Sequence, residues 1–329
     1  RLVGSEMCIR DSRGTDCKKG DFIMTYQLAE GVNLHVLQTK QYKTVRIFVR
    51  FTTRLAKETL TKRSLLSSLL ETNSLNYPDQ TQLSAKLADL YGASFGLSVR
   101  KKGNLHWLNA GISFVNGKYV NDSEIFNEAV DFLKEVLFYP NIKEQKFDQL
   151  TFDLEKNNLK LYLESLNEDK QTMASLALQE LYFEQSDAQK IPSFGTIEDL
   201  EELTAESLAT YYQEMIANDQ VDIFVVGDVS EEEVKVALEK LPFTGRTYAH
   251  PEIYYSQPKV NIIKERQIQE PVVQAKLNLA YQTDIYYDQP ERFSLMVFNG
   301  LFGGFPHSKL FMNVREKESL AYYCLLYTS

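Results

Sequence analysis

The stretch TVRIFVRFT, residues 44–52, alternates apolar and polar side chains from Val45 to Phe51. Because successive side chains of a strand point to opposite faces, this period of two predicts a half-buried β-strand. The stretch KRSLLSSLLE, residues 62–71, comes after it and spaces its leucine pairs at helical intervals. A strand followed by a buried helix predicts a domain in which a sheet is layered with helices.

The same two periods continue through residues 24–243, which we expect to form one domain of the α+β class with a mixed sheet layered with helices. Further strands are predicted at residues 33–38, 94–100, 106–114 and 221–226. Further helices are predicted at residues 79–90, 122–138, 145–166, 170–183, 205–215 and 230–241.

Residues 244–259 hold Gly245, Pro251 and Pro258 and fit neither period, so we interpret them as a linker. The residues after it, 260–323, repeat the opening order of strand, charged gap and helix, with VQAKLNLAY at 273–281 and ERFSLMVFNGL at 291–301. This order predicts a duplicated α+β unit whose second copy is truncated.

The two ends differ from the rest in composition and periodicity. RLVGSEMCIRDS at residues 1–12 and CLLYTS at 324–329 resemble translated adaptor sequence, and the codons for Lys19-Gly20-Asp21 can spell a ribosome-binding site before Met24. We therefore expect residues 1–23 to be a non-native, untranslated leader and 324–329 a non-native tail. The alternative is a disordered N-terminal tail, since termini are often disordered.

Charge and cysteine usage exclude several classes of function. The chain has 329 residues, a formal net charge of −9 and a pI of about 5.2. Neither nucleic acid nor an anionic membrane is expected as a partner, because both require a basic surface. Cys8, Cys17 and Cys324 lie near the ends, which excludes a disulfide framework, a cysteine-ligated zinc site and thiol catalysis.

No apolar run is long enough to span a bilayer and residues 1–19 are too polar for a signal peptide, so we expect a cytoplasmic protein.

One stretch carries a family signature: FNGLFGGFPHSKLFMNVREKESLAY, residues 298–322, a glycine-rich turn followed by L-F-x-x-x-R-E-K-x-x-L-A-Y. With VVGDV at residues 225–229 and the order of strands and long helices, it resembles the insulinase/pitrilysin family, which includes mitochondrial processing peptidase. The resemblance implies two insulinase-like metallopeptidase domains. The chain looks most similar to degenerate bacterial members associated with modification of elongation factor P.

Active members of that family carry H-x-x-E-H on the first long helix, where two histidines bind zinc and the glutamate is the general base. A glutamate on a later helix is the third ligand. The resemblance places Ser64-Leu65-Leu66-Ser67-Ser68 at the motif and Tyr162 at the third ligand. Serine hydroxyls are weak zinc ligands and cannot act as a carboxylate base. We therefore expect a degenerate zinc site, no bound metal, no other cofactor and no catalytic residue.

The histidines test this expectation without an alignment. His35, His106, His250 and His307 are widely separated, so no pair has the spacing of i and i+4 that two zinc ligands on one helix require. We interpret all four as ordinary strand, linker or turn histidines. An active metallopeptidase is nearly excluded.

The signature stretch implies substrate-binding residues. In the family, an arginine and a tyrosine spaced like Arg315 and Tyr322 reach the substrate backbone beside the zinc of the facing domain, where both can donate to a carbonyl or an oxyanion. The alternative is a surface arginine and a core tyrosine. Gly303 and Gly304 either let a peptide pass close to the backbone or only form the turn.

These observations predict a non-catalytic subunit that contacts a peptide or protein substrate and forms a heterodimer with a zinc-bearing subunit of the same family. The alternative is a binding or scaffolding pseudo-peptidase with no proteolytic partner. A neighbouring gene that encodes the same fold with an intact H-x-x-E-H motif would favour the first hypothesis.

Overall fold

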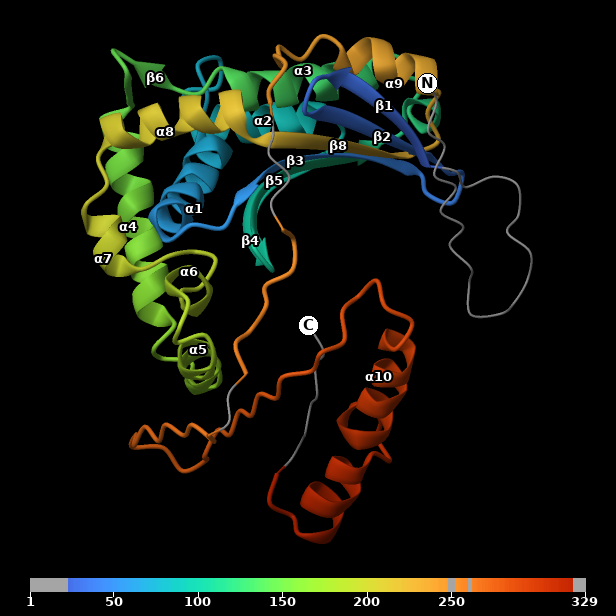
Figure 1. Cartoon of the computed structure of the whole chain (residues 1–329). Helices are drawn as coiled ribbons and strands as arrows, with labels where there is room; N and C mark the ends of the chain where they lie inside the picture. The colour runs from blue at the N-terminus through green and yellow to red at the C-terminus, as the bar shows by residue number, and fades with distance from the viewer. Residues whose placement is uncertain (1–22, 248–251, 260–261, 322–329) are drawn as a thin grey trace. The chain divides into compact units, whose positions relative to one another are not determined.

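The computed structural model describes residues 23–247, 252–259 and 262–321 (Figure 1). The chain divides into two units, Arg1–Asn278 and Leu279–Ser329. The expectations for the leader, for His250, for Tyr322 and for the tail with Cys324 lie outside the described residues.

A six-stranded mixed sheet organises the first unit, in the order β1-β2-β8-β3-β5-β4. The pair β2 and β8 is parallel, whereas the other neighbours in the sheet are antiparallel. The α+β class with a mixed sheet is therefore confirmed. The strands are β1 (Ile23–Ala29), β2 (Val32–Gln38), β3 (Thr44–Arg54), β4 (Ser94–Lys102), β5 (Leu105–Val115) and β8 (Gln220–Gly227).

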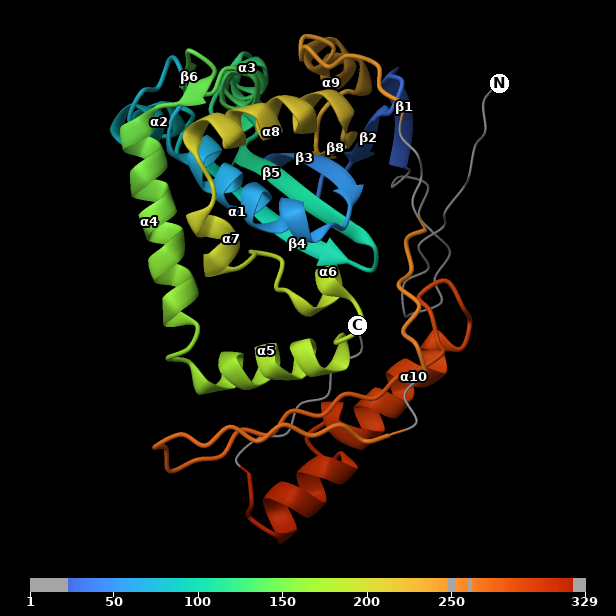
Figure 2. The same ribbon diagram turned by 60° about the vertical axis from the view of Figure 1, so that its left-hand side comes forward.

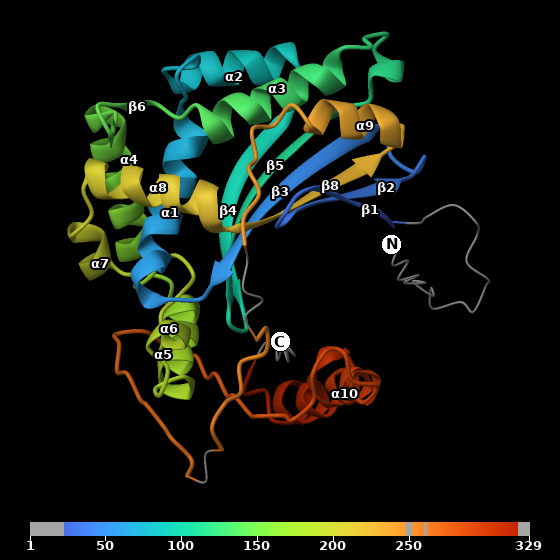
Figure 3. The ribbon, with the colours of Figure 1, turned by 45° about the horizontal axis from the view of Figure 1, so that its top comes forward.

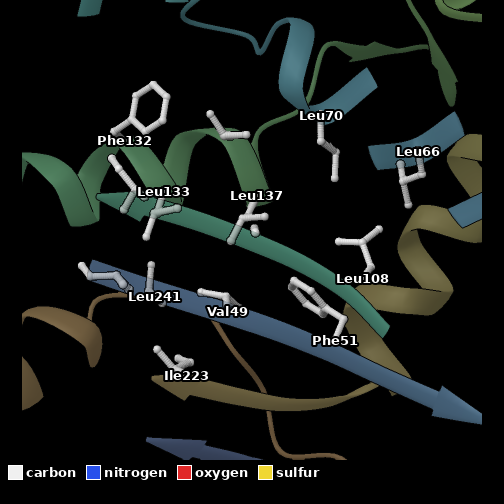
Figure 4. Packing of buried hydrophobic residues seen from close by; sticks show 14 of the residues in the cluster. Val49, Phe51, Leu66, Leu70, Leu108, Phe132, Leu133, Leu137, Ile223 and Leu241 are labelled. Atoms are coloured by element: carbon white, nitrogen blue, oxygen red, sulfur yellow. The ribbon is translucent and has the colours of Figure 1, made fainter. Parts of the chain in front are cut away.

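The central strand β3 contains the stretch with which the sequence argument began. It pairs with β5 on one side and β8 on the other, and its side chains alternate as predicted. Val49 and Phe51 are fully buried and point with Leu108 and Ile223 toward leucines of the overlying helices (Figure 4). Burial of this kind contributes about 1.5–3 kcal/mol for each large apolar side chain, so this face of the sheet is the core.

Helices lie over that face, α3, α8 and α9 among them (Figure 1, Figure 3). The alternate side chains of the strands point to the opposite face of the sheet. There, Arg46 is exposed and Arg50 is half-buried. The helices of the first unit are α1 (Lys57–Thr72), α2 (Gln80–Asp89), η1 (Gly117–Tyr119), α3 (Ile125–Phe138), α4 (Gln149–Ser165), α5 (Lys170–Tyr182), α6 (Asp187–Lys190), α7 (Ile197–Glu201), α8 (Ala205–Asn218) and α9 (Glu231–Leu238).

The helix predicted from residue 145 begins later than expected. A short hairpin of β6 (Ile142–Lys143) and β7 (Lys146–Phe147) precedes it, and Gln145 has a positive φ of 63°. That conformation is incompatible with a right-handed helix, so α4 starts only after Asp148, whose carboxylate accepts a hydrogen bond from the Thr151 backbone N–H at 3.0 Å.

The strand predicted at residues 273–281 is wrong. A strand needs a neighbour for its backbone hydrogen bonds, and among the described residues no other strand pairs with this segment. Its apolar residues Val273 and Leu277 are exposed. The predicted linker, residues 244–259, contains no helix or strand in its described part.

The second unit contains α10 (Arg292–Asn299), which continues into the π-helical η2 (Gly300–Gly304), and a second π-helical segment, η3 (Phe311–Lys317). The helix predicted at residues 291–301 is therefore confirmed. Of the order of strand, charged gap and helix that the sequence predicts after residue 260, the described residues form the helix but not the strand.

Candidate functional site

The positions at which the sequence predicts a degenerate zinc site lie on α1 and α4, two helices that pack together (Figure 1, Figure 2). At the end of α1, Thr72 Oγ1 donates to Glu155 Oε1 at 3.0 Å, and Asn73 Nδ2 donates to Thr151 Oγ1 at 2.8 Å. These contacts join the last turn of α1 to the first half of α4. The two helices are therefore antiparallel, and the second half of α4 returns toward the start of α1.

Tyr162 lies in that second half of α4. It is 48% exposed, and its ring contacts Phe194 edge-on with centroids 5.6 Å apart. The residue after Phe194, Gly195, packs against Thr61, one turn before Ser64 on α1. The fold thus brings Tyr162 to the part of α1 that holds the serines.

Two hydroxyls of α1, those of Ser67 and Thr72, form hydrogen bonds to the backbone of the same helix. Ser64 and Ser67 are buried, and Ser67 Oγ donates to the Ser64 carbonyl oxygen at 2.7 Å. Ser68 is half-buried, and its carbonyl oxygen accepts from Thr72 Oγ1 at 2.9 Å. Hydroxyl groups that bond back to the helix in this way are typical of serine and threonine inside helices.

This set of donors does not fit zinc. Zinc sites in proteins use thiolate, imidazole and carboxylate ligands, whereas Ser64, Ser67, Ser68 and Tyr162 offer only neutral hydroxyls. Within the described ranges, no three His, Cys, Asp or Glu side chains are grouped as metal ligands would be. No residue at these positions can act as the carboxylate base of a metallopeptidase, so we derive no catalytic step from them.

A buried arginine lies directly before the serines. The Arg63 side chain is fully buried, and its Nη1 donates to Asp219 Oδ2 at 2.6 Å and to the Tyr211 hydroxyl at 3.2 Å. Its Nη2 donates to the Phe51 carbonyl oxygen at 2.8 Å. Burial alone would lower the pKa of Arg63, but the charge of Asp219 and the hydrogen bond to it raise the pKa. Arg63 thus links α1 to α8 and to the central strand, which is a structural role.

The histidines that the structure describes lie outside α1 and α4. His106 in β5 is fully buried, and burial together with the charge of Arg63 lowers its pKa to about 3, so it is neutral. His35 in β2 is half-buried, with Nε2 3.2 Å from Asp222 Oδ1. His307 lies beside Phe305 in the second unit, with ring centroids 5.7 Å apart.

The substrate-binding residues expected from the signature stretch lie in the second unit. Arg315 on η3 is 35% exposed, and its guanidinium lies over the Phe311 ring, 4.4 Å from the centroid. The expected glycine-rich turn is instead helical: Gly303 and Gly304 form the end of η2, where Gly303 is buried and Gly304 is exposed. Helical hydrogen bonding by this segment explains the difference, since the Phe305 N–H donates to the Gly300 carbonyl oxygen at 3.0 Å.

A further polar cluster on the sheet was not predicted as a site. The Arg50 guanidinium lies 4.2 Å from the Trp107 ring centroid, 5.3 Å from that of Phe48 and 5.5 Å from that of Phe224. Burial lowers the pKa of Arg50, although the charge of Asp222 opposes this. The sequence already indicates part of this cluster, because Arg46, Phe48 and Arg50 alternate with the core residues in the stretch TVRIFVRFT.

A mixed sheet covered by helices, with only hydroxyls at the positions where the sequence predicts a zinc site, is the arrangement expected of a metallopeptidase fold without catalytic groups. Comparison with known proteins agrees. Residues 202–329 match the family model described as the peptidase M16 inactive domain. A probable inactive metalloprotease, YmfF of Bacillus subtilis (strain 168), is 37% identical over 296 residues, which cover 89% of this chain and 69% of the relative. The chain therefore belongs to the M16 peptidase family, as a non-catalytic homologue.

Solved structures share this fold. A conserved protein from Enterococcus faecalis V583 is 62% identical with a TM-score of 0.87, and the match covers 92% of this chain and 71% of that one. A peptidase M16 inactive domain from Pseudomonas fluorescens has the same fold at 18% identity and a TM-score of 0.68, covering 92% of this chain and 69% of that one. No helix in the described part of the chain is long and apolar enough to cross a membrane.

Proposed function

We propose that this chain is a non-catalytic, peptide-contacting subunit that pairs in the cytoplasm with a zinc-bearing M16 subunit. The observation that carries the proposal is an asymmetry between two sets of residues. The zinc-site positions hold only hydroxyls, two of them buried, whereas Arg315 of the signature stretch keeps a partly exposed guanidinium. A chain that retains a peptide-binding group without a zinc site is suited to complement a chain that has one.

The guanidinium of Arg315 is suited to peptide contact for physical reasons. Its stacking on Phe311 restricts the side chain, so less conformational freedom is lost when it binds. It has five N–H donors in a planar fork, and these can donate to a peptide carbonyl or carboxylate.

Co-expression with a zinc-bearing M16 protein encoded near this gene tests the proposal. Size-exclusion chromatography with light scattering would report pairing, and cleavage of a quenched fluorescent peptide would report activity. Arg315→Ala should lower kcat/KM of the complex by about 30- to 150-fold, corresponding to roughly 2–3 kcal/mol for a lost charge-assisted hydrogen bond, and leave pairing intact.

The matched control is Lys317→Ala, which removes a cation that is 73% exposed on the same helical segment. It should change kcat/KM by less than about threefold, because exposed charges contribute little. Tyr322→Phe would show what the second hydroxyl contributes. Unchanged activity in the Arg315 and Tyr322 variants with an intact complex would contradict peptide contact and favour a scaffold. Absence of any complex would contradict pairing.

A further inference from the structure

The sheet face opposite the helices is basic, although the whole chain carries a net charge of −9. The strand registers place five cations on this face and one acidic residue, Asp222. The cations are Arg46, Arg50, Arg54, Arg100 and Lys102. Such a concentration of one sign of charge on a protein of the opposite sign indicates a surface for a negatively charged ligand.

The carboxylate of the acidic residue on this face already has hydrogen-bond partners within the protein. Asp222 Oδ1 lies 3.2 Å from His35 Nε2 and accepts from Asn33 Nδ2 at 3.1 Å, and Oδ2 accepts from Gln220 Nε2 at 3.1 Å. At the edge of the sheet, Glu71 Oε2 accepts from the Leu97 backbone N–H at 3.0 Å. Neither carboxylate forms an ion pair with an arginine of this face within the part of the chain that the structure describes.

Arg50 is held in place by aromatic rings. It lies over Trp107, Phe48 and Phe224, and its Nε donates to Asn109 Oδ1 at 3.2 Å. Stacking fixes the side chain before a ligand arrives, so less entropy is lost on binding than for a free arginine. Arg46 lies four residues before Arg50 on the same face of β3, is exposed and forms no ion pair within the described ranges.

A hollow on the same face is lined in part by Arg46 and by Asn109, the partner of Arg50. Gly96 and Gly111 are register partners on β4 and β5, and with neighbouring serines they leave a depression of about 410 Å³ next to Arg46 and Phe48. An added Cβ at Gly111 would meet only ordinary contacts, with Phe48 Cδ2 3.5 Å away as the nearest atom. The absence of side chains at these two positions therefore leaves room for a side chain of a ligand.

We propose that this face binds an extended acidic peptide segment, with carboxylates on Arg46 and Arg50 and an apolar side chain in the hollow between Phe48 and the glycine pair. This inference rests on the proposed peptide-contacting function and specifies the charge of the peptide. Carboxylates match the planar fork of arginine, and the bare backbone at Gly96 and Gly111 allows a chain to approach closely. Single-stranded nucleic acid is disfavoured because it carries a negative charge on every nucleotide, and the net charge of −9 repels it more strongly than a short peptide with a few carboxylates.

Fluorescence anisotropy on the full chain tests the proposal. The probe is a fluorescein-labelled peptide of about ten residues that contains Glu and Asp around a central Phe. The comparison probes are the same peptide with Lys and Arg in place of the acids, and a labelled oligothymidylate. The acidic peptide should bind at least about tenfold more tightly than the basic one, and its affinity should fall as salt rises from about 0.02 to 0.2 M.

Variants localise the binding to this face. Arg46→Gln should weaken binding of the acidic peptide by about 5- to 10-fold, since it removes one charge-assisted contact at a partly solvated site. Gly111→Val fills the hollow with a residue that favours strands and should weaken binding comparably without unfolding the sheet. Lys143→Gln removes the same charge from an exposed residue of β6, outside this sheet, and should leave affinity within about twofold.

Several results would overturn the proposal. They are equal binding of the acidic and basic peptides, tighter binding of the oligothymidylate, unchanged affinity in both Arg46→Gln and Gly111→Val, or an equal loss in Lys143→Gln. Pairing with a zinc-bearing subunit is measured separately by light scattering. A chain that pairs but fails the peptide test would therefore contradict only the sheet-face proposal, and a chain that does not pair would contradict the proposed function.

Discussion

The two faces of the sheet in the first unit differ in how their arginines are used. On the helix-covered face, Arg63 is fully buried and its charge is matched by Asp219 at 2.6 Å. On the opposite face, Arg46 is exposed and Arg50 is stacked on aromatic rings. The arginine on the face that α1 covers thus has a structural role, whereas the arginines on the other face are placed where a ligand can reach them. Changes on the first face should alter stability, and changes on the second face should alter binding.

The largest effect on stability is expected from Arg63→Met. The substitution leaves Asp219 buried without its partner, and breaking a buried pair costs about 3–5 kcal/mol. Urea denaturation followed by circular dichroism would measure the loss of the free energy of unfolding. The paired substitution on the other face, Arg46→Gln, should change it by less than about 0.5 kcal/mol.

The double variant Arg63→Met/Asp219→Asn sharpens this test. Because it removes both charges, it should recover part of the loss seen in Arg63→Met. Equal destabilisation by Arg63→Met and Arg46→Gln would break the distinction between the two faces.

The pH dependence of stability should also originate on the helix-covered face. Burial and the charge of Arg63 lower the pKa of His106 to about 3, compared with roughly 6.5 in an unfolded chain. Between these values the unfolded state binds more protons, so the free energy of unfolding falls as pH is lowered from about 6.5 toward 3. This group alone should contribute a fall of about 3 kcal/mol between pH 6.5 and 4.

The measurement is the difference between the wild type and His106→Leu, since carboxylates titrate in both proteins. Stability of the wild type should fall more steeply with acid than that of the variant. Parallel curves would show that His106 is not held neutral by the core.

A smaller effect is expected at the contact between α1 and the loop before α7. Gly195 has a φ of 86°, and an added Cβ would overlap the Thr61 side chain. Gly195→Ala should therefore cost about 1–3 kcal/mol through backbone strain and steric overlap. Gly92→Ala is the matched control, because Gly92 has a φ of 73° and no atom within 4 Å of an added Cβ. If the two variants lose the same stability, the steric contact with Thr61 contributes nothing.

The sequence predicted the elements whose pattern is local. The alternation in residues 44–52 and the leucine spacing in 62–71 predicted β3 and the buried part of α1, because both depend on side chains only a few residues apart. The start of α4 depended on two consecutive residues with positive φ, Glu144 and Gln145, neither of which is glycine. No pattern of apolar residues reveals such a conformation, so the prediction began the helix too early.

For the candidate sites too, the sequence shows the residue types but not the contacts between distant strands. Residue types alone predict that zinc lacks ligands at Ser64, Ser67, Ser68 and Tyr162, because neutral hydroxyls are weak zinc ligands. The alternation in residues 44–52 places Phe48 and Arg50 on one face, but Trp107 and Phe224 come from two other strands and meet Arg50 only through the register, so the complete cluster could not be predicted. At residues 273–281 the alternation of apolar and polar side chains is typical of a strand, but among the described residues no neighbouring strand pairs with this segment, so no strand forms.

The smallest expected effect is that of zinc on the wild-type chain. Zinc should not bind stoichiometrically after mild dialysis, and it should not raise the melting temperature, because Ser64, Ser67, Ser68 and Tyr162 provide no charged or imidazole ligand. Ser64→His/Ser68→His restores two ligands on one face of α1 but not the one at Tyr162 on α4. It should therefore bind zinc weakly at most, and both positions lie in packed surroundings that imidazole must disturb. Adding Tyr162→Glu supplies the carboxylate from the neighbouring helix and should tighten binding measurably by calorimetry. One zinc per wild-type chain, retained against a weak chelator, would show that this helix pair has kept a metal site and would break the contrast between the two faces.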